Sequence, residues 1–393
     1  MIPVVHFIPS KSTSGSGMTE HPRPDTMLVS RSPGETRYAL MAGEELIEVV
    51  HRRDAEVQPG AIYLGRAGAR LAGINALFVD IGDAVPGVLA FKAKLPAQGA
   101  AVPVAVVVPP RGGKGAELKF AEAEKFADVK APGLLRAAPE PIHAWWARDA
   151  KTLRRILCAP RAETTRVKAL LPAAAPVADH GAGADMFAAY GVDEAIAAAL
   201  RAEVSLPGGG SLIIESTAAV TAVDVNSGAA DPATANAEAL GVLAMELRRR
   251  NIAGHIVVDM IPERARRRAA WPRLLAEALA DDSVPAQVAG LTPLGMIELT
   301  RRRLGLSLAE ALQERDGVLS AASVAYGLLR DAVRFAISEK AAGVALEAAP
   351  EVVALLQGAL RAALDEAEAT VKGRITLGAR AEFARGRREL RRL

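Results

Sequence analysis

Two aspartates stand at equivalent places in the sequence, each at the end of an apolar run typical of a β-strand. Asp224 closes the run in TAVDVNSG, and Asp259 closes the run in HIVVDMI. Open α/β sheets bind ligands at the carboxyl ends of their strands, so two carboxylates there can serve one site. They would repel each other unless a cation or a proton lay between them, and Mg²⁺ binds through one or two carboxylates plus substrate phosphate. The pair predicts a Mg²⁺ site for chemistry at phosphorus; the alternative is that each aspartate only caps the loop after it.

Asn226 follows Asp224 by two residues and therefore projects from the same face of the strand. We expect its side chain to orient a carboxylate or a water. His255 and Glu298 lie in the neighbouring segments. A lone histidine at a strand start is more often structural, and an acid beside three arginines can hold one of them. Neither residue is assigned a role.

The segments that carry these residues alternate between strand and helix from residue 206 onward. Helical apolar spacing covers residues 234–250 and 264–280, and the first of these helices ends in arginines, which suits a helix C-terminus. The expected strands are SLIIE, AVTAVDVN, HIVVDMI and PAQVAGL. Strands separated by helices of this length indicate an α/β layer.

The rest of the chain divides by its local patterns. Residues 36–108 consist of short β runs broken by Gly and Pro, which predict a small barrel or sandwich. A basic, Gly-rich loop at 109–120 brings Lys114 and backbone N–H groups within reach of a phosphate, although such a loop can also be an ordinary turn. The Ala-rich stretch 121–205 is mostly helical in pattern. Residues 318–393 predict two or three helices with one strand in GRITL.

Charge and cysteine content limit the function classes. The net charge is only +3, but arginines gather in four runs, which is the pattern of proteins that follow a phosphate backbone; for any single run a solvated helix face is the alternative. One cysteine, Cys158, excludes an internal disulfide and a CxxC zinc site. No apolar stretch approaches the roughly 18 residues that a membrane span needs. We expect a cytoplasmic protein.

Several of these segments together resemble one family. The order LPGGGSLIIESTAAVTAVDVNSG, ANAEALGVLAMELRRRNIAGHIVVDMI and LGMIELTRRR closely resembles the catalytic core of the ribonuclease E/G family. Upstream, SRSPGETRYAL, AIYLGRAGARLAGINALFVDIG and the GKGAEL loop resemble that family's OB-type RNA-binding barrel, and GLLRAAPEPIHAWWARDA resembles the segment after its 5′-end sensor. The resemblance covers residues 30 to 303.

The resemblance implies a fold and a domain order. An OB-type β-barrel would precede an α/β nuclease layer of DNase I-like type, followed by a small C-terminal α/β subdomain. The expected parts are a disordered N-terminus (1–30, with Met18 or Met27 as alternative starts), the OB-type RNA-binding barrel (31–120), a reduced helical, sensor-derived region (121–205), the catalytic α/β domain (206–303) and the C-terminal subdomain (304–393).

The resemblance also implies an activity. Asp224 and Asp259 carry over as the Mg²⁺-holding pair and Asn226 as their support, in an endoribonuclease that cleaves single-stranded RNA in rRNA or mRNA processing or decay and leaves 5′-phosphate and 3′-hydroxyl ends. The residues implied to contact RNA are Phe78, which would stack on a base or else be an ordinary barrel-core Phe, Lys114, and Arg301 at the edge of the active-site cleft.

Four departures from the family pattern qualify this interpretation. A CPxC zinc-link is missing after RRRLGLSL, so no zinc-linked dimer is expected and the oligomeric state stays open. The chain is shortened between Leu118 and Pro132, where the family senses 5′ ends. Val88 replaces a second aromatic, and Pro262 replaces an acid. The alternative is therefore a catalytically weak or inactive RNA-binding relative; a third possibility is a ribosome- or protein-binding scaffold that uses the C-terminal arginines.

Overall fold

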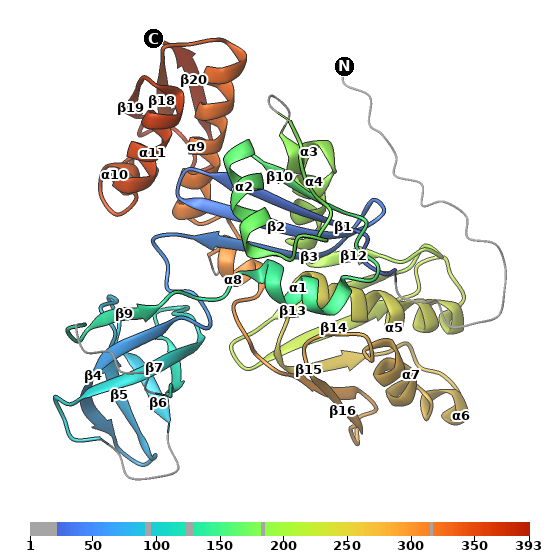
Figure 1. The fold of residues 1–393 in the computed structure, drawn as a ribbon. Coiled ribbons are helices and arrows are strands. Elements are labelled where there is room, and N and C mark those ends of the chain that lie inside the picture. Colours follow the sequence, from blue (N-terminus) through green and yellow to red (C-terminus); the bar gives the residue numbers. More distant parts are fainter. Residues whose placement is uncertain (1–21, 91–95, 123–128, 182–184, 315–316) are drawn as a thin grey trace. The chain divides into compact units, whose positions relative to one another are not determined.

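The computed structural model describes residues 22–90, 96–122, 129–181, 185–314 and 317–393, and Figure 1 shows its elements. The chain forms two compact units. The first, called here the aspartate unit, contains Arg201–Arg248 and Ile252–Arg302; the second contains Pro24–Leu200, Arg249–Asn251 and Arg303–Leu393. The predicted disorder of residues 1–30 lies mostly outside the described residues. Strand β1 already begins at Thr26, earlier than that boundary.

The aspartate unit is built on a six-stranded mixed sheet with the order β12-β13-β14-β15-β17-β16. Its only parallel pair is β14 and β15, and the other pairs are antiparallel. Parallel neighbours need a crossover connection, which helix α5 supplies. The strands are β12 (Glu203–Ser205), β13 (Ser211–Ser216), β14 (Val220–Asn226), β15 (Gly254–Asp259), β16 (Ala286–Leu291) and β17 (Ile297–Arg301), and the helices are α5 (Pro232–Arg249), α6 (Ala265–Arg268) and α7 (Trp271–Ala278).

One face of this sheet packs against helices α5 and α7 (Figure 1). Burial alternates along β14, where Val223 and Val225 enter the core while Asp224 and Asn226 are exposed on the opposite face. The predicted α/β layer is confirmed, and its DNase I-like type stays a prediction. The helix expected over 264–280 is two helices, α6 and α7, with Trp271 and Pro272 at the start of the second.

Strands of the second unit form a closed five-stranded barrel, consistent with the OB type. Consecutive pairings join β4, β5, β6, β8 and β7, and β7 pairs back to β4; β9 adds to β4 from outside that circle. The strands are β4 (Ile62–Leu71), β5 (Ala76–Asp80), β6 (Gly87–Ala90), β7 (Ala101–Val108), β8 (Glu117–Phe120) and β9 (Gly133–Arg136). The barrel interior is filled by Val, Leu, Ile and Ala side chains.

The predicted limits of the barrel, 31–120, differ from those in the structure. The runs TRYALMA and LIEVVH are strands β2 and β3 of a separate five-stranded sheet with the order β11-β10-β1-β2-β3. Two of its strands lie within the segment expected to be helical, 121–205, and β1 pairs parallel with β10. The elements are β1 (Thr26–Ser32), β2 (Glu35–Ala42), β3 (Glu45–Arg53), β10 (Arg155–Ala159), β11 (Val177–Asp179), α1 (Pro141–Asp149), α2 (Arg161–Leu170), α3 (Met186–Ala189) and α4 (Val192–Ala199).

This sheet is covered on both faces. One core includes α3 and α4 residues, and another includes residues of α1 and α2. Strand β2 is consequently buried along nearly its whole length instead of alternating between core and solvent. The barrel strands fall between β3 and β10 in the sequence, so the barrel is an insertion into this layer.

The C-terminal part packs three helices on a three-stranded sheet with the order β19-β18-β20. The strand predicted in GRITL is β19, and the expected helices are present. The elements are α8 (Leu308–Leu312), α9 (Ala321–Ser338), β18 (Gly343–Ala348), α10 (Pro350–Gln357), α11 (Arg361–Val371), β19 (Arg374–Ala379) and β20 (Arg388–Arg392). Across the described ranges, no helix is long and apolar enough to cross a membrane.

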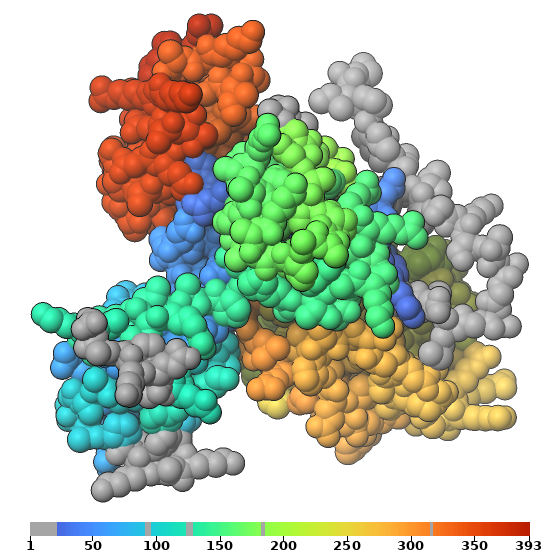
Figure 2. Space-filling model, in the orientation of Figure 1, coloured from blue at the N-terminus to red at the C-terminus, as the bar shows by residue number. Residues whose placement is uncertain are grey.

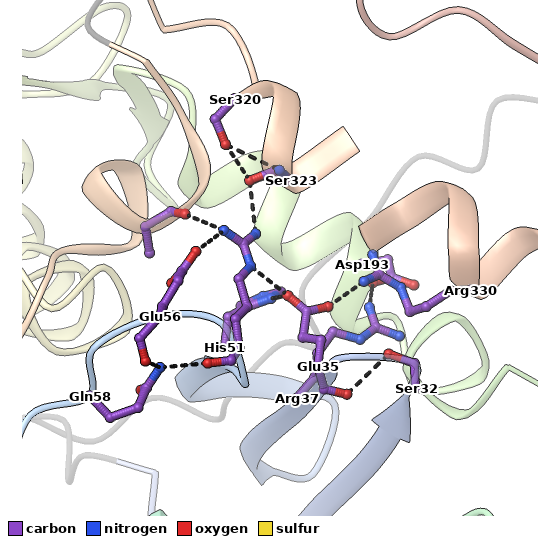
Figure 3. A network of polar contacts seen from close by, with 12 residues as sticks. Ser32, Glu35, Arg37, His51, Glu56, Gln58, Asp193, Ser320, Ser323 and Arg330 are labelled. Atoms are coloured by element: carbon purple, nitrogen blue, oxygen red, sulfur yellow. Dashed lines mark hydrogen bonds and ion pairs between the residues drawn. The ribbon is translucent and has the colours of Figure 1, made fainter. Parts of the chain in front are cut away.

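A buried polar network joins β2 and β3 to α9 (Figure 3). Its centre is Glu35, which is fully buried and accepts hydrogen bonds from His51 Nδ1 at 3.1 Å, from Arg53 Nε at 3.0 Å and from Arg330. Burial alone would raise the pKa of Glu35, but the charges of His51, Arg330 and Arg53 hold this pKa well below its ordinary value. Burial also lowers the pKa of His51. Arg53 continues the network to Ser323 at the start of α9.

Candidate functional site

Asp224 and Asp259 are direct neighbours in the sheet. They are Cα partners in the parallel ladder between β14 and β15, so their side chains leave the same face. Adjacent strands lie about 4.8 Å apart, which brings the two residues to the separation at which carboxylates influence each other. Both are exposed, and among the described residues neither forms an ion pair with a cationic side chain. A pair of neighbouring, unneutralised carboxylates favours a bound cation.

Asn226 completes the group on β14. Its Nδ2 donates a hydrogen bond to Asp224 Oδ2 at 3.0 Å. This bond restricts the rotamer of Asp224 and occupies one of its carboxylate oxygens. It is the contact that a supporting residue would make, and a role for Asn226 in catalysis stays a prediction.

Glycines of the LPGGG turn hold the backbone at Asn226. A Cβ on Gly210 would come closer to the Asn226 carbonyl oxygen than the 3.0 Å that real Cβ atoms respect, and would lie 3.2 Å from the Ser227 carbonyl oxygen. On the other side, Gly228 has a φ of +55°, and a Cβ there would meet the Gly209 carbonyl. Two backbone segments thus pack directly against each other, and only glycine permits the approach.

The chain beyond Asp259 is fixed by Asn236 of α5, which is buried. Asn236 accepts from the Ile261 N–H at 3.1 Å, and its Nδ2 donates to the Ile261 carbonyl at 2.9 Å and to Glu263 at 3.2 Å. Glu263 also accepts from Trp271 Nε1 at 3.1 Å. Sequence reasoning missed these positioning residues. The available signal was a polar Asn among the mostly apolar side chains on the buried stripe of a helix.

The donor set suits Mg²⁺ better than a metal that requires a full protein cage. Two aspartate carboxylates and an amide oxygen are the hard ligands that Mg²⁺ takes, together with several waters and substrate phosphate. Within the described ranges, no three His, Cys, Asp or Glu side chains lie close enough to form a metal cage. Glu298 is on the same face, but its partner in the ladder is Val257, which precedes Asp259 by two residues on β15. With Pro262 in the third acidic position and Glu263 bound to Trp271, the aspartate pair is the candidate centre.

Comparison with known proteins shows which family the chain resembles. The sequence model described as the Ribonuclease E/G family matches residues 118–304. Ribonuclease G of Escherichia coli K12 is 28% identical over 87% of this chain and 94% of its own length, and Ribonuclease G of Salmonella typhimurium is 27% identical with the same coverage. Ribonuclease E of a Nostoc species is 44% identical over 31% of this chain and 19% of its own length. The chain is therefore similar to the ribonuclease E/G family, most specifically over residues 118–304.

The region matched by the family model contains Asp224, Asn226 and Asp259. The alignment with either Ribonuclease G extends over 462 positions, which exceeds the 393 residues of this chain, so both relatives contain segments that this chain lacks. The shortening expected between Leu118 and Pro132 includes residues 123–128, which lie outside the described residues. Cys158 is buried, and burial raises the pKa of its thiol to about 12, so it offers no exposed metal ligand.

Phe78 and Lys114 lie on the barrel surface. Phe78 is 38% exposed on β5, so it is not the barrel-core residue of the alternative interpretation. It pairs with Val88 on β6, the position where the family pattern has its second aromatic. Lys114 is exposed at the end of a tight turn closed by two backbone hydrogen bonds with Arg111. Both side chains are accessible to RNA, and their role in binding stays a prediction.

The structure does not support the RNA-contacting role predicted for Arg301. This residue is only 2% exposed and lies on the core face of β17, with Ile297 and Leu299, opposite to the face of the aspartates. Its Nε and Nη2 bind the buried Asp282 at 2.7 and 3.1 Å, and its Nη1 donates to the Ile252 carbonyl at 2.9 Å. Arg301 is therefore a structural residue of the aspartate unit. The TRRR motif alone did not show which of its arginines is buried in the core.

Proposed function

We propose that this protein is a Mg²⁺-dependent endoribonuclease that cleaves single-stranded RNA and leaves 5′-phosphate and 3′-hydroxyl ends. The observation that carries the proposal is the in-register, exposed pair Asp224 and Asp259, which no cationic side chain of the described residues neutralises. Similarity to proteins named Ribonuclease G and Ribonuclease E supports RNA as the substrate.

Asp224 and Asp259 would hold the metal between them. When bound, Mg²⁺ supplies an activated water and offsets charge that develops on the phosphate. The protein's contribution is to keep two exposed carboxylates adjacent on one face of the sheet. Asn226 holds Asp224 in one orientation through its hydrogen bond, and the Gly210 contact fixes the backbone from which Asn226 projects. Positions held in this way need little reorganisation during reaction.

The barrel would bind the RNA strand. Phe78 offers an exposed aromatic face on which an unpaired base can stack, and stacking of this kind tolerates any sequence. Lys114, in the turn before β8, would attract a phosphate. With Val88 in place of a second aromatic, the barrel has one stacking platform at this pair of positions instead of two.

Cleavage of a labelled single-stranded oligoribonucleotide tests the proposal. Wild type and Asp224→Asn are compared with Mg²⁺ and with chelator, and melting temperatures verify that the exposed substitution leaves the fold intact. We expect Mg²⁺-dependent products with 5′-phosphates, lost in the variant while RNA binding persists. Unchanged cleavage by Asp224→Asn would refute the metal site. RNA binding without cleavage under any divalent metal would favour the catalytically inactive RNA-binding relative.

A further inference from the structure

In three of the four arginine runs, most side chains bind acidic residues or backbone carbonyls of the protein itself. Arg249 binds Glu45 at 2.7 Å and the Leu46 carbonyl at 2.6 Å, and Arg250 is buried. In the next run Arg301 binds Asp282 and Arg303 binds Glu310. The C-terminal ion pairs are Arg385 with Glu314 and Glu351, Arg387 and Arg391 with Glu389, and Arg388 with Asp331. Most of these arginines are therefore already neutralised within the protein.

The remaining run, Arg264–Arg268, is different; it is called here the arginine segment. All four of its arginines are exposed. Only Arg267 has an acidic partner, Glu263 at 3.3 Å; for Arg264, Arg266 and Arg268 the described part of the chain offers no acid within ion-pair distance. Figure 2 shows this yellow part of the chain at the protein surface. Three uncompensated guanidinium groups within five residues create a local positive field that attracts anions.

The arginine segment is held close to the aspartate pair. It follows Asp259 by five residues, which limits the Cα separation of Asp259 and Arg264 to roughly 17 Å. The intervening chain is not a free linker, because buried Asn236 binds both Ile261 and Glu263. The field of the arginines is consequently anchored at a fixed place relative to Asp259.

The far end of the arginine segment borders the same end of the sheet. Arg268 Nη1 lies 3.8 Å from where a Cβ on Gly295 would stand. Gly295 is in the turn from Thr292 to Met296 that connects β16 to β17. This turn leads into Ile297, the partner of Val258 and thus the neighbour of the Asp259 position. Arg268 and Asp259 therefore lie toward the same end of the sheet.

We propose that Arg264, Arg266 and Arg268 bind consecutive phosphates of a single RNA strand beside the aspartate centre. This inference rests on the proposed nuclease function and adds to it a second contact surface, apart from the barrel. Guanidinium groups bind phosphate oxygens through paired hydrogen bonds without reading bases, so the contact is independent of sequence. It holds the strand a few nucleotides from the bond to be cleaved.

Salt dependence of RNA binding tests the proposal. The substitutions Arg264→Gln, Arg266→Gln and Arg268→Gln are combined, and binding of a fluorescent oligoribonucleotide is titrated by anisotropy at several salt concentrations. The measurement is made in the Asp224→Asn background, so that no RNA is cut. Each lost phosphate contact on a single strand lowers the slope of log K against log salt by about 0.7, so three contacts correspond to about 2.

A matched control removes the same net charge elsewhere. Arg387→Gln, Arg388→Gln and Arg391→Gln also delete three positive charges, but from arginines that are already paired with acids. We expect the salt slope to fall by about 2 in the first triple variant and to stay unchanged in the control, with similar melting temperatures. Equal slopes in the two triple variants, or no RNA binding by the parent chain, would overturn the inference. Failure of the nuclease proposal would be seen separately, as absence of RNA cleavage by the wild-type protein, which retains Asp224.

Discussion

Substitution of Gly210 by alanine should impair catalysis through a backbone displacement. The new Cβ would stand within 3.0 Å of the Asn226 carbonyl oxygen and 3.2 Å from that of Ser227, whereas ordinary contact begins at 3.4 Å. Neither oxygen belongs to a flexible side chain, so the backbone at Asn226 must retreat by more than half an ångström to reach 3.0 Å and by about 1 Å to reach ordinary contact. That movement is passed to Asp224 through the Nδ2–Oδ2 hydrogen bond.

The expected magnitude follows from the sensitivity of catalysis to position. A displacement of 1 Å can cost 10²-fold in rate, so the retreat at Asn226 corresponds to a loss of roughly 10- to 100-fold in kcat/KM. The crowded contact should also lower the free energy of unfolding by about 1–3 kcal/mol. The assay is steady-state cleavage of a labelled oligoribonucleotide with Mg²⁺, with urea unfolding monitored in parallel.

The matched control is Gly208→Ala in the same turn. A Cβ at Gly208 would meet only the Glu238 carboxylate at 3.1 Å, the far end of a flexible side chain that can move aside. This variant should retain kcat/KM and stability close to those of wild type. If Gly210→Ala is as active as Gly208→Ala, the reasoning that connects the turn to Asn226 is refuted.

Two further predictions concern buried charges. Arg301→Gln leaves Asp282 buried without its partner and should lower the free energy of unfolding, measured with urea, by about 3–5 kcal/mol. The salt dependence of RNA binding should stay unchanged. A smaller salt slope with unaltered stability would instead make Arg301 a phosphate contact. Stability should also fall on acidification. The folded pKa of His51 lies below its ordinary 6.5 and that of Glu35 well below 4.5, so the unfolded chain takes up protons first as pH drops below each ordinary value. The melting temperature should decrease from about pH 6.5 downward and more steeply below pH 4.5. His51→Asn should remove the part of this decrease that lies above pH 4.5. A melting temperature that is constant between pH 8 and 5 would contradict the lowered pKa of His51.

The sequence predicted the aspartate unit well because its signals are local. Apolar runs ending in Asp224 and Asp259 identify two strands, and the helix between them makes those strands parallel neighbours. The exact register of the two aspartates could not be obtained in this way, since a shift of two residues along the ladder keeps the same side chains on the buried face. Register here depends on packing of the whole sheet against α5 and α7.

Arg301 and the barrel limits show where local patterns fail. The alternation Ile297, Leu299, Arg301 places the arginine on the core face, a period-two signal that was available but was outweighed by its basic neighbours. Its partner Asp282 lies 19 residues away and is found only in three dimensions. Strands β2 and β3 resemble barrel strands in composition. Only their pairing assigns them to the other sheet: β3 pairs with β2, β2 with β1, and β1 with β10.

The insertion of the barrel between β3 and β10 sets an order in which the chain can fold during synthesis. All barrel strands lie within Ile62–Arg136, so their pairing partners leave the ribosome together. The surrounding sheet must wait for β10, and Glu35 must wait for Arg330, 295 residues later. At 5–20 residues per second that delay is about 15 to 60 s. For this interval Glu35, which is fully buried in the folded protein, remains hydrated. Its transfer from water into the protein interior is therefore a late event of folding.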